Sequence, residues 1–194
     1  MNSLPCGTVT FLFTDIEGST KLAQEHPDEM PALLARHNEI LNQAIEAHKG
    51  YVFQIVGDSF SAAFHFASDA LNAALNAQRQ LQNESWTASP VKVRMGIHIG
   101  TSQLNDPAAP TVYTGYVTLA TTQRVMSAGH GGQILLSNEV TDKVRGSLPK
   151  GAALRDLARH QLKGINQPEH LFQVVADDLQ TNFLYEFGLV GAVS

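Results

Sequence analysis

Residues 91–100 alternate between apolar side chains and polar residues or glycines, and this pattern constrains the fold more than any other in the chain. A strict period of two over ten residues is typical of a β-strand that buries one face. The apolar side chains at positions 91, 93, 95, 97 and 99 therefore belong to a core. Lys92 and Arg94 fall on the opposite face, which we expect to be exposed, and His98 fits a hydrogen-bonded structural histidine.

The rest of the chain mixes strands, hairpins and helices. Strands are predicted at 8–14, 51–56, 59–64, 133–136, 152–157, 160–162 and 170–175. Apolar residues at three- and four-residue spacing predict helices within 21–48 and at 66–82. Residues 116–127 can form a helix despite their threonines, and Ser137 caps a predicted helix through Arg145. Helices combined with hairpins indicate an α+β fold, in which a mixed sheet is covered largely on one face.

Composition narrows the class of protein. The 194 residues suit one domain with a short tail, and 13 basic against 18 acidic side chains give a net charge of −5. This balance argues against a nucleic-acid surface and against binding to an anionic membrane. No apolar run approaches the ~20 residues of a transmembrane helix. Cys6 is the only cysteine, so an intrachain disulfide is impossible, and we expect a cytoplasmic location.

Two aspartates stand at strand ends beside turns that contain glycine. Asp15 follows the first strand and precedes Gly18, whereas Asp58 lies at the tip of the predicted hairpin. If the first strand pairs with that hairpin, both carboxylates meet at one edge of the sheet, where hard oxygen ligands can hold Mg²⁺ or Mn²⁺. The residues alone leave a second reading open, in which both side chains serve only turns and caps.

Five segments, in this order along the chain, resemble the catalytic domains of class III nucleotidyl cyclases. They are residues 7–20, 50–64, 94–100, 124–137 and 162–174. The resemblance implies a ferredoxin-like, mostly antiparallel sheet with covering helices. It also implies a cyclase homology domain over residues 1–178, followed by a C-terminal tail or the start of a linker at 179–194.

The resemblance also implies a metal site and a reaction. In this family two aspartates bind two divalent ions, Mg²⁺ or Mn²⁺, and these aspartates correspond to Asp15 and Asp58, with the backbone carbonyl of Ile16 as a further ligand. The ribose 3′-hydroxyl attacks the α-phosphorus of a nucleoside triphosphate, and pyrophosphate leaves. Arg124 is implied as the side chain that stabilises the developing charge.

The resemblance further implies how substrate is held. The triphosphate would face the loop of Gly18, Ser19 and Thr20, where backbone N–H groups favour an anion. Lys163 near the last hairpin is the candidate phosphate-binding lysine, with His170 as the alternative. The family's sites lie at the interface of a head-to-tail dimer. Because this chain carries both the aspartates and the arginine, a homodimer with two equivalent sites is implied.

The positions that read the base depart from the family pattern. Gln54 stands where ATP-using members have a lysine. Tyr113, or Val112 if the alignment shifts by one residue, stands where aspartate or threonine is usual. Because a glutamine amide can both donate and accept, Gln54 does not distinguish adenine from guanine.

A second departure concerns catalysis. Ala120 replaces the family's asparagine four residues before Arg124, and the loss of one such donor costs ~3 kcal/mol of transition-state stabilisation. Thr118 or Thr121 is a candidate substitute for the missing amide.

Two functions of the chain therefore stay open. The first is a cyclase that converts ATP, or GTP, into the 3′,5′-cyclic monophosphate, and the second is a nucleotide- and metal-binding regulatory module without turnover.

Overall fold

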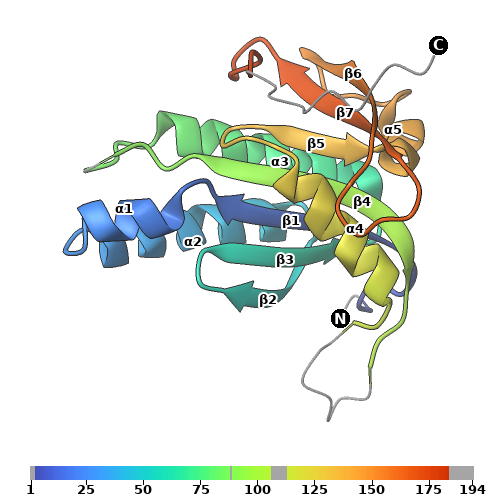
Figure 1. The fold of residues 1–194 in the computed structure, drawn as a ribbon, viewed down its shortest axis with the longest axis horizontal. Coiled ribbons are helices and arrows are strands. Elements are labelled where there is room, and N and C mark those ends of the chain that lie inside the picture. Colours follow the sequence, from blue (N-terminus) through green and yellow to red (C-terminus); the bar gives the residue numbers. More distant parts are fainter. Residues whose placement is uncertain (1–2, 88, 106–112, 184–194) are drawn as a thin grey trace.

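The computed structural model describes residues 3–87, 89–105 and 113–183, and seven strands in these ranges form one sheet (Figure 1). The strand order is β2-β3-β1-β4-β5-β7-β6. Every neighbouring pair is antiparallel except β4 and β5. The strands are β1 (Gly7–Ile16), β2 (Tyr51–Val56), β3 (Ser59–Phe64), β4 (Val93–Ser102), β5 (Ile134–Ser137), β6 (Ala152–His160) and β7 (Glu169–Ala176).

Helices cover both faces of the sheet, but unequally. The helices in the described ranges are α1 (Ser19–Glu25), α2 (Met30–Ala47), α3 (Ala67–Asn83), α4 (Tyr116–Ser127) and α5 (Asn138–Val144). Buried side chains of α2, α3 and α5 share the main hydrophobic core with inward side chains of β1, β3, β4, β5 and β7. Only α4 lies across the other face, where Figure 1 shows it in front of the sheet. The predicted α+β class, with a mostly antiparallel sheet, is confirmed.

The alternation at residues 91–100 sets the two faces of β4. Val93, Met95 and Ile97 are fully buried in the main core, as their spacing predicts. On the opposite face Lys92 is exposed as predicted, but α4 covers the strand from Gly96 to Gly100. A Cβ atom on Gly96 would lie only 2.3 Å from the backbone nitrogen of Met126 in α4, so the glycine permits this close approach. His98 is buried and its Nδ1 lies 2.9 Å from the Ser137 hydroxyl, which fits the predicted structural histidine.

One local prediction was wrong. We expect a break after residue 157 and a new strand at 160–162, but β6 is continuous to His160. An irregularity between Asp156 and Arg159, with Ala158 at φ 65°, absorbs the extra residues that look like a break in the sequence. In the helix 116–127, by contrast, the predicted bounds agree with α4.

The chain turns back on itself after β7. Residues 177–183, here called the C-terminal segment, are tied to α3 by an ion pair of 2.6 Å between Arg79 and Asp178. The side chains of Gln82 and Arg155 also donate to backbone carbonyls of this segment, at 2.9 and 2.7 Å. The remainder of the predicted tail, 184–194, lies outside the described residues. No helix in the described part of the chain is long and apolar enough to cross a bilayer.

Candidate functional site

Strand pairing brings Asp15 and Asp58 together. Asp15 lies near the end of β1, and Asp58 lies in the turn that joins β2 to β3. Since β1 pairs with β3 through Thr14 and Phe60, both aspartates fall at the same edge of the sheet. The backbone N–H of Ile16 donates to Asp58 Oδ2 at 2.9 Å, which ties the hairpin tip directly to the residue after Asp15.

Burial and proximity both favour the neutral form of Asp58. Burial raises the pKa of Asp58, and the neighbouring Asp15 carboxyl raises the pKa further, although the Ile16 N–H opposes the shift. Two carboxyl groups that share a partly buried place repel each other when both are ionised. A cation at this point would relieve that repulsion.

Arg94 supplies one such cation, although its place in the alternating pattern predicts no contact with Asp15. Arg94 Nη2 and Nε lie 2.5 and 3.1 Å from Asp15 Oδ2, and its side chain is 28% exposed. The prediction that Arg94 is a solvent-exposed side chain is therefore wrong. The antiparallel register of β1 and β4 sets Arg94 opposite Asp15, and this register cannot be read from either strand alone. On Asp15's other oxygen, the Ser59 hydroxyl lies 3.4 Å from Oδ1.

The donor set at this edge suits a hard divalent cation. Two carboxylates and the adjacent Ile16 carbonyl are oxygen ligands of the kind that Mg²⁺ and Mn²⁺ prefer. Within the described residues no group of three or more His, Cys, Asp or Glu side chains forms a complete metal cage. A magnesium ion commonly completes its shell with water and substrate phosphates, so two carboxylates and one carbonyl fit such a site.

The loop after Asp15 runs into α1. Gly18 is left-handed at φ 71° and its carbonyl accepts the Leu22 N–H at the start of the helix, so Ser19 and Thr20 are already helical residues. The Glu17 N–H donates to the Lys92 carbonyl at 2.9 Å, which fixes the loop to the start of β4. The three predicted phosphate-facing residues thus begin three positions after Asp15.

Arg124 lies on a different element from the aspartates. It is a partly buried residue of α4, and in the described part of the chain its side chain makes no ion pair. The proposed substitutes for the missing asparagine are unsuited to that role. The Thr118 hydroxyl is buried and donates to the Thr101 carbonyl at 3.1 Å, and Thr121 is 3% exposed. Ala120 lies one helical turn before Arg124, with no amide to offer.

The two base-reading candidates have different environments. Gln54 is exposed on β2, beside a register irregularity that begins at Val52. Tyr113 is 3% exposed, and its ring packs edge-on against Phe11 and Phe53 at centroid distances of 5.3 and 4.9 Å. Burial raises the pKa of Tyr113, and its hydroxyl has no hydrogen-bond partner among the described residues. The alternative residue, Val112, lies outside the described ranges.

The phosphate-binding candidates are also distinguishable. Lys163 is exposed in the turn between β6 and β7. His170 Nε2 lies 2.6 Å from Asp156 Oδ1, and the ring stacks on Phe172 at 4.5 Å. Because His170 is already engaged by a carboxylate and an aromatic ring, Lys163 is the better placed of the two for an incoming anion.

The chain is similar to known proteins over most of its length. A family model described as the adenylate and guanylate cyclase catalytic domain matches residues 1–176. An uncharacterized protein of Mycobacterium tuberculosis is 40% identical over 181 residues, which cover 92% of this chain and 60% of that protein. The chain thus spans less than two thirds of this relative's length. An adenylate cyclase of Schizosaccharomyces pombe is 28% identical over 220 residues, covering 92% of this chain and 13% of that enzyme.

Solved structures show the same fold. A structure of adenylate cyclases from Trypanosoma brucei in their monomeric state superposes with a TM-score of 0.77 at 25% identity, over 88% of this chain and 90% of that one. A guanylate cyclase domain from Catenaria anguillulae, solved in complex with GTP, gives a TM-score of 0.75 at 21% identity, over 88% and 97% of the two chains. The family model and the similar folds confirm the resemblance to the class III cyclases.

Proposed function

The chain belongs to the adenylate and guanylate cyclase catalytic domain family, and we propose that it converts a purine nucleoside triphosphate, ATP or GTP, into the 3′,5′-cyclic monophosphate and pyrophosphate. The observation that carries this proposal is the meeting of Asp15 and Asp58 at one sheet edge, joined by the Ile16 N–H contact of 2.9 Å. Relatives named as adenylate cyclases and a fold neighbour solved with GTP support the substrate class.

Asp15, Asp58 and the Ile16 carbonyl would hold two divalent ions. When bound, such ions neutralise the triphosphate and lower the pKa of the attacking hydroxyl. The chain's own residues do the rest. Arg94, which lies against Asp15, keeps a fixed positive charge at the triphosphate position, and the loop of Gly18, Ser19 and Thr20 presents backbone N–H groups there. Lys163 and Arg124 supply further cations, and the role of Arg124 is to stabilise the charge that develops on the α-phosphate.

A homodimer supplies the complete site in this proposal. Tyr116 and Val117 at the start of α4 are 87% and 72% exposed, and Val56 at the tip of β2 is 64% exposed. Large apolar side chains exposed to this degree favour burial against another surface. We propose that a second copy of the chain covers them and contributes its Arg124 to the aspartates of the first.

The test is product formation by the purified chain with ATP and with GTP, each with Mg²⁺ and with Mn²⁺. We expect cyclic nucleotide above the level of an Asp58→Ala control, most clearly with Mn²⁺. Chromatography of the reaction mixture separates the cyclic product from the linear monophosphate. No cyclic product above the control with any of the four combinations would refute the proposal.

Ala120 favours a second candidate, a nucleotide-binding module without turnover. In that case the chain binds a non-cyclisable triphosphate analogue in a metal-dependent way and forms no product. The variant Ala120→Asn discriminates further, because it restores the amide one turn before Arg124. If the missing donor limits the rate, this variant turns over faster by about two orders of magnitude.

A further inference from the structure

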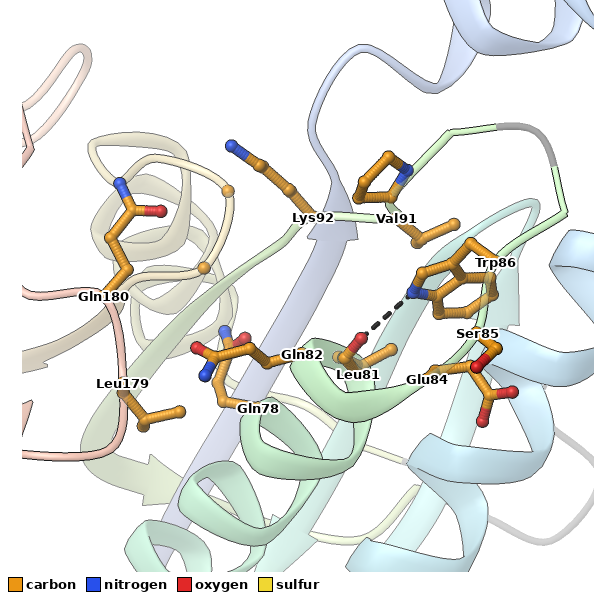
Figure 2. Close-up of a pocket in the computed structure, with 13 residues that line it drawn as sticks. Gln78, Leu81, Gln82, Glu84, Ser85, Trp86, Val91, Lys92, Leu179 and Gln180 are labelled. Atoms are coloured by element: carbon orange, nitrogen blue, oxygen red, sulfur yellow. Dashed lines mark hydrogen bonds between the residues drawn. The ribbon is translucent and has the colours of Figure 1, made fainter.

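A cavity of about 410 Å³ lies beside the candidate site and uses none of its residues (Figure 2). Three separate parts of the chain enclose it. They are the end of α3 with the connection to β4, the Gly131–Gly132 turn before β5, and the C-terminal segment through Leu179 and Gln180. A volume of this size is typical of sites for small organic molecules.

One wall of the cavity is aromatic and held in place. The Trp86 indole N–H donates to the Leu81 carbonyl at 3.0 Å, which fixes the orientation of the ring. In Figure 2, Val91 lies on the same side as Trp86, and the Leu179 side chain lies toward the opposite side. A fixed indole with aliphatic neighbours suits a flat aromatic body, because aromatic rings gain from stacked or edge-to-face contact as well as from burial.

Lys92, at the rim of the cavity, carries a positive charge that forms no ion pair within the described residues. Lys92 is exposed, and none of the carboxylates in the described residues lies within ion-pair distance of it. The acidic residues nearby have other partners. Glu17 lies across Gly131 from Lys92, and its Oε1 is 3.8 Å from His130 Nδ1. Glu84 pairs with Arg36 at 2.7 Å, and Asp178 pairs with Arg79. The amides of Gln82 and Gln180 flank the same opening (Figure 2).

We propose that this cavity binds a planar aromatic anion, whose ring lies against Trp86 and whose anionic group pairs with Lys92. An exposed ion pair contributes little on its own, so contact with the apolar wall must provide most of the affinity, and Lys92 provides selectivity for charge. A nucleoside monophosphate and an arylalkyl carboxylate both present this chemistry.

A hydrogen bond and packing contacts join the cavity wall to the loop after Asp15. The Lys92 carbonyl accepts the Glu17 N–H at 2.9 Å. Gly131 is packed between the same two residues, since a Cβ atom there would lie 2.6 Å from the Lys92 Cβ and 3.0 Å from the Glu17 Cβ. A ligand that restrains Lys92 therefore restrains the loop beside the paired aspartates. This regulatory consequence rests on the proposed function, whereas binding in the cavity does not.

Trp86 is the single tryptophan of the chain, so its fluorescence reports on the cavity alone. The probes are AMP and 3-phenylpropionate, each compared with its uncharged counterpart, adenosine or 3-phenylpropanamide, in excess EDTA. We expect a saturable change with at least one anion and about tenfold weaker binding of its uncharged counterpart. The anion that responds identifies the source of the ligand chemistry. Lys92→Gln weakens the response about tenfold, whereas the exposed control Lys150→Gln leaves it unchanged.

Three results would overturn the proposal. They are equal binding of the uncharged counterpart, no saturable response to either anion up to about 10 mM, and an undiminished response in Lys92→Gln. The response must also survive in Asp58→Ala, because loss there would place the ligand at the aspartates. If the anion binds but leaves a measurable cyclase rate unchanged, the coupling is refuted. If no cyclase rate exists, only the proposed function fails and the binding result stands.

Discussion

Asp15 is held by two side chains of its own chain, and this shapes how the aspartate pair meets a metal ion. Arg94 contacts Oδ2 at 2.5 and 3.1 Å, and Ser59 lies 3.4 Å from Oδ1. The guanidinium offsets part of the repulsion between Asp15 and Asp58, so the two carboxyl groups can be adjacent without a bound cation. The same guanidinium competes with a metal ion for Asp15.

Replacing Arg94 by glutamine separates these two effects. We expect Arg94→Gln to bind Mn²⁺ several-fold more tightly, on the order of 1 kcal/mol, because Asp15 loses its competing partner. Cyclic nucleotide formation should fall, because the triphosphate loses a cation. Calorimetric titration with Mn²⁺ measures the first effect, and Arg159→Gln on exposed β6 is the control. Weaker Mn²⁺ binding by Arg94→Gln would contradict a competing role.

We expect the buried His37 to make the free energy of unfolding decrease at acidic pH. It is fully buried in α2 against Phe60, and burial lowers its pKa below the ordinary value of 6.5. Because the unfolded chain takes up this proton more readily, the contribution to stability is complete above pH 6.5 and is lost as the pH falls below that value. We expect His37→Leu to flatten the decline of the free energy of unfolding between pH 7 and 5. Urea denaturation at several pH values measures it. The partly exposed His26→Leu should leave the slope unchanged.

At the scale of elements, the contact of α4 with β4 depends on two missing side chains. A Cβ atom on Gly96 would meet the Met126 backbone, and one on Gly100 would meet the Thr118 side chain. Both glycines lie on the α4 side of β4, so the helix approaches the strand more closely than larger residues would allow. This approach fixes the height of Arg124 above the sheet.

A methyl group on Gly96 should therefore disturb both stability and activity. The Cβ of Gly96→Ala would lie 2.3 Å from the Met126 nitrogen, so α4 must move or the strand must bend. Overpacking of this kind costs about 2 kcal/mol in the free energy of unfolding. Gly146→Ala is the matched control, since nothing lies within 4 Å of a Cβ there. Chemical denaturation of the two variants gives the comparison, and an equal loss of stability in both would contradict this account.

Local pattern predicted the elements well where one period dominated, as in β4 and α3. It failed where the outcome depends on residues distant in sequence. Arg94 and Lys92 share one face of the same stretch, yet only Arg94 lies opposite Asp15, because the register of β1 against β4 decides this. The aspartate pair was predicted only on the condition that β1 joins the hairpin. The cavity beside Trp86 had no signal in the sequence, since three segments far apart in the chain enclose it.

On the scale of the whole molecule, the paired aspartates and Arg124 lie on different elements of the chain. The aspartates occupy a sheet edge, and Arg124 lies on α4, with no ion pair among the described residues. The exposed apolar side chains at Tyr116 and Val117 begin the same helix that carries Arg124. The exposed apolar residues and the arginine that the proposed function assigns to the partner's site thus lie on the same helix, α4. This placement supports delivery of Arg124 by a second copy.

Two inactive variants should then restore each other. Asp58→Ala removes a metal ligand and Arg124→Ala removes the delivered cation, so each homodimer is inactive in both sites. In a mixed dimer one site combines both defects, and the other has the intact aspartate of one protomer with the intact arginine of its partner. Random pairing of equal amounts yields at most about a quarter of the wild-type rate. The measurement is cyclic nucleotide formation after co-refolding or prolonged mixing. If each site used aspartates and arginine from the same protomer, the mixture would stay as inactive as its components, and the shared-site dimer would be refuted.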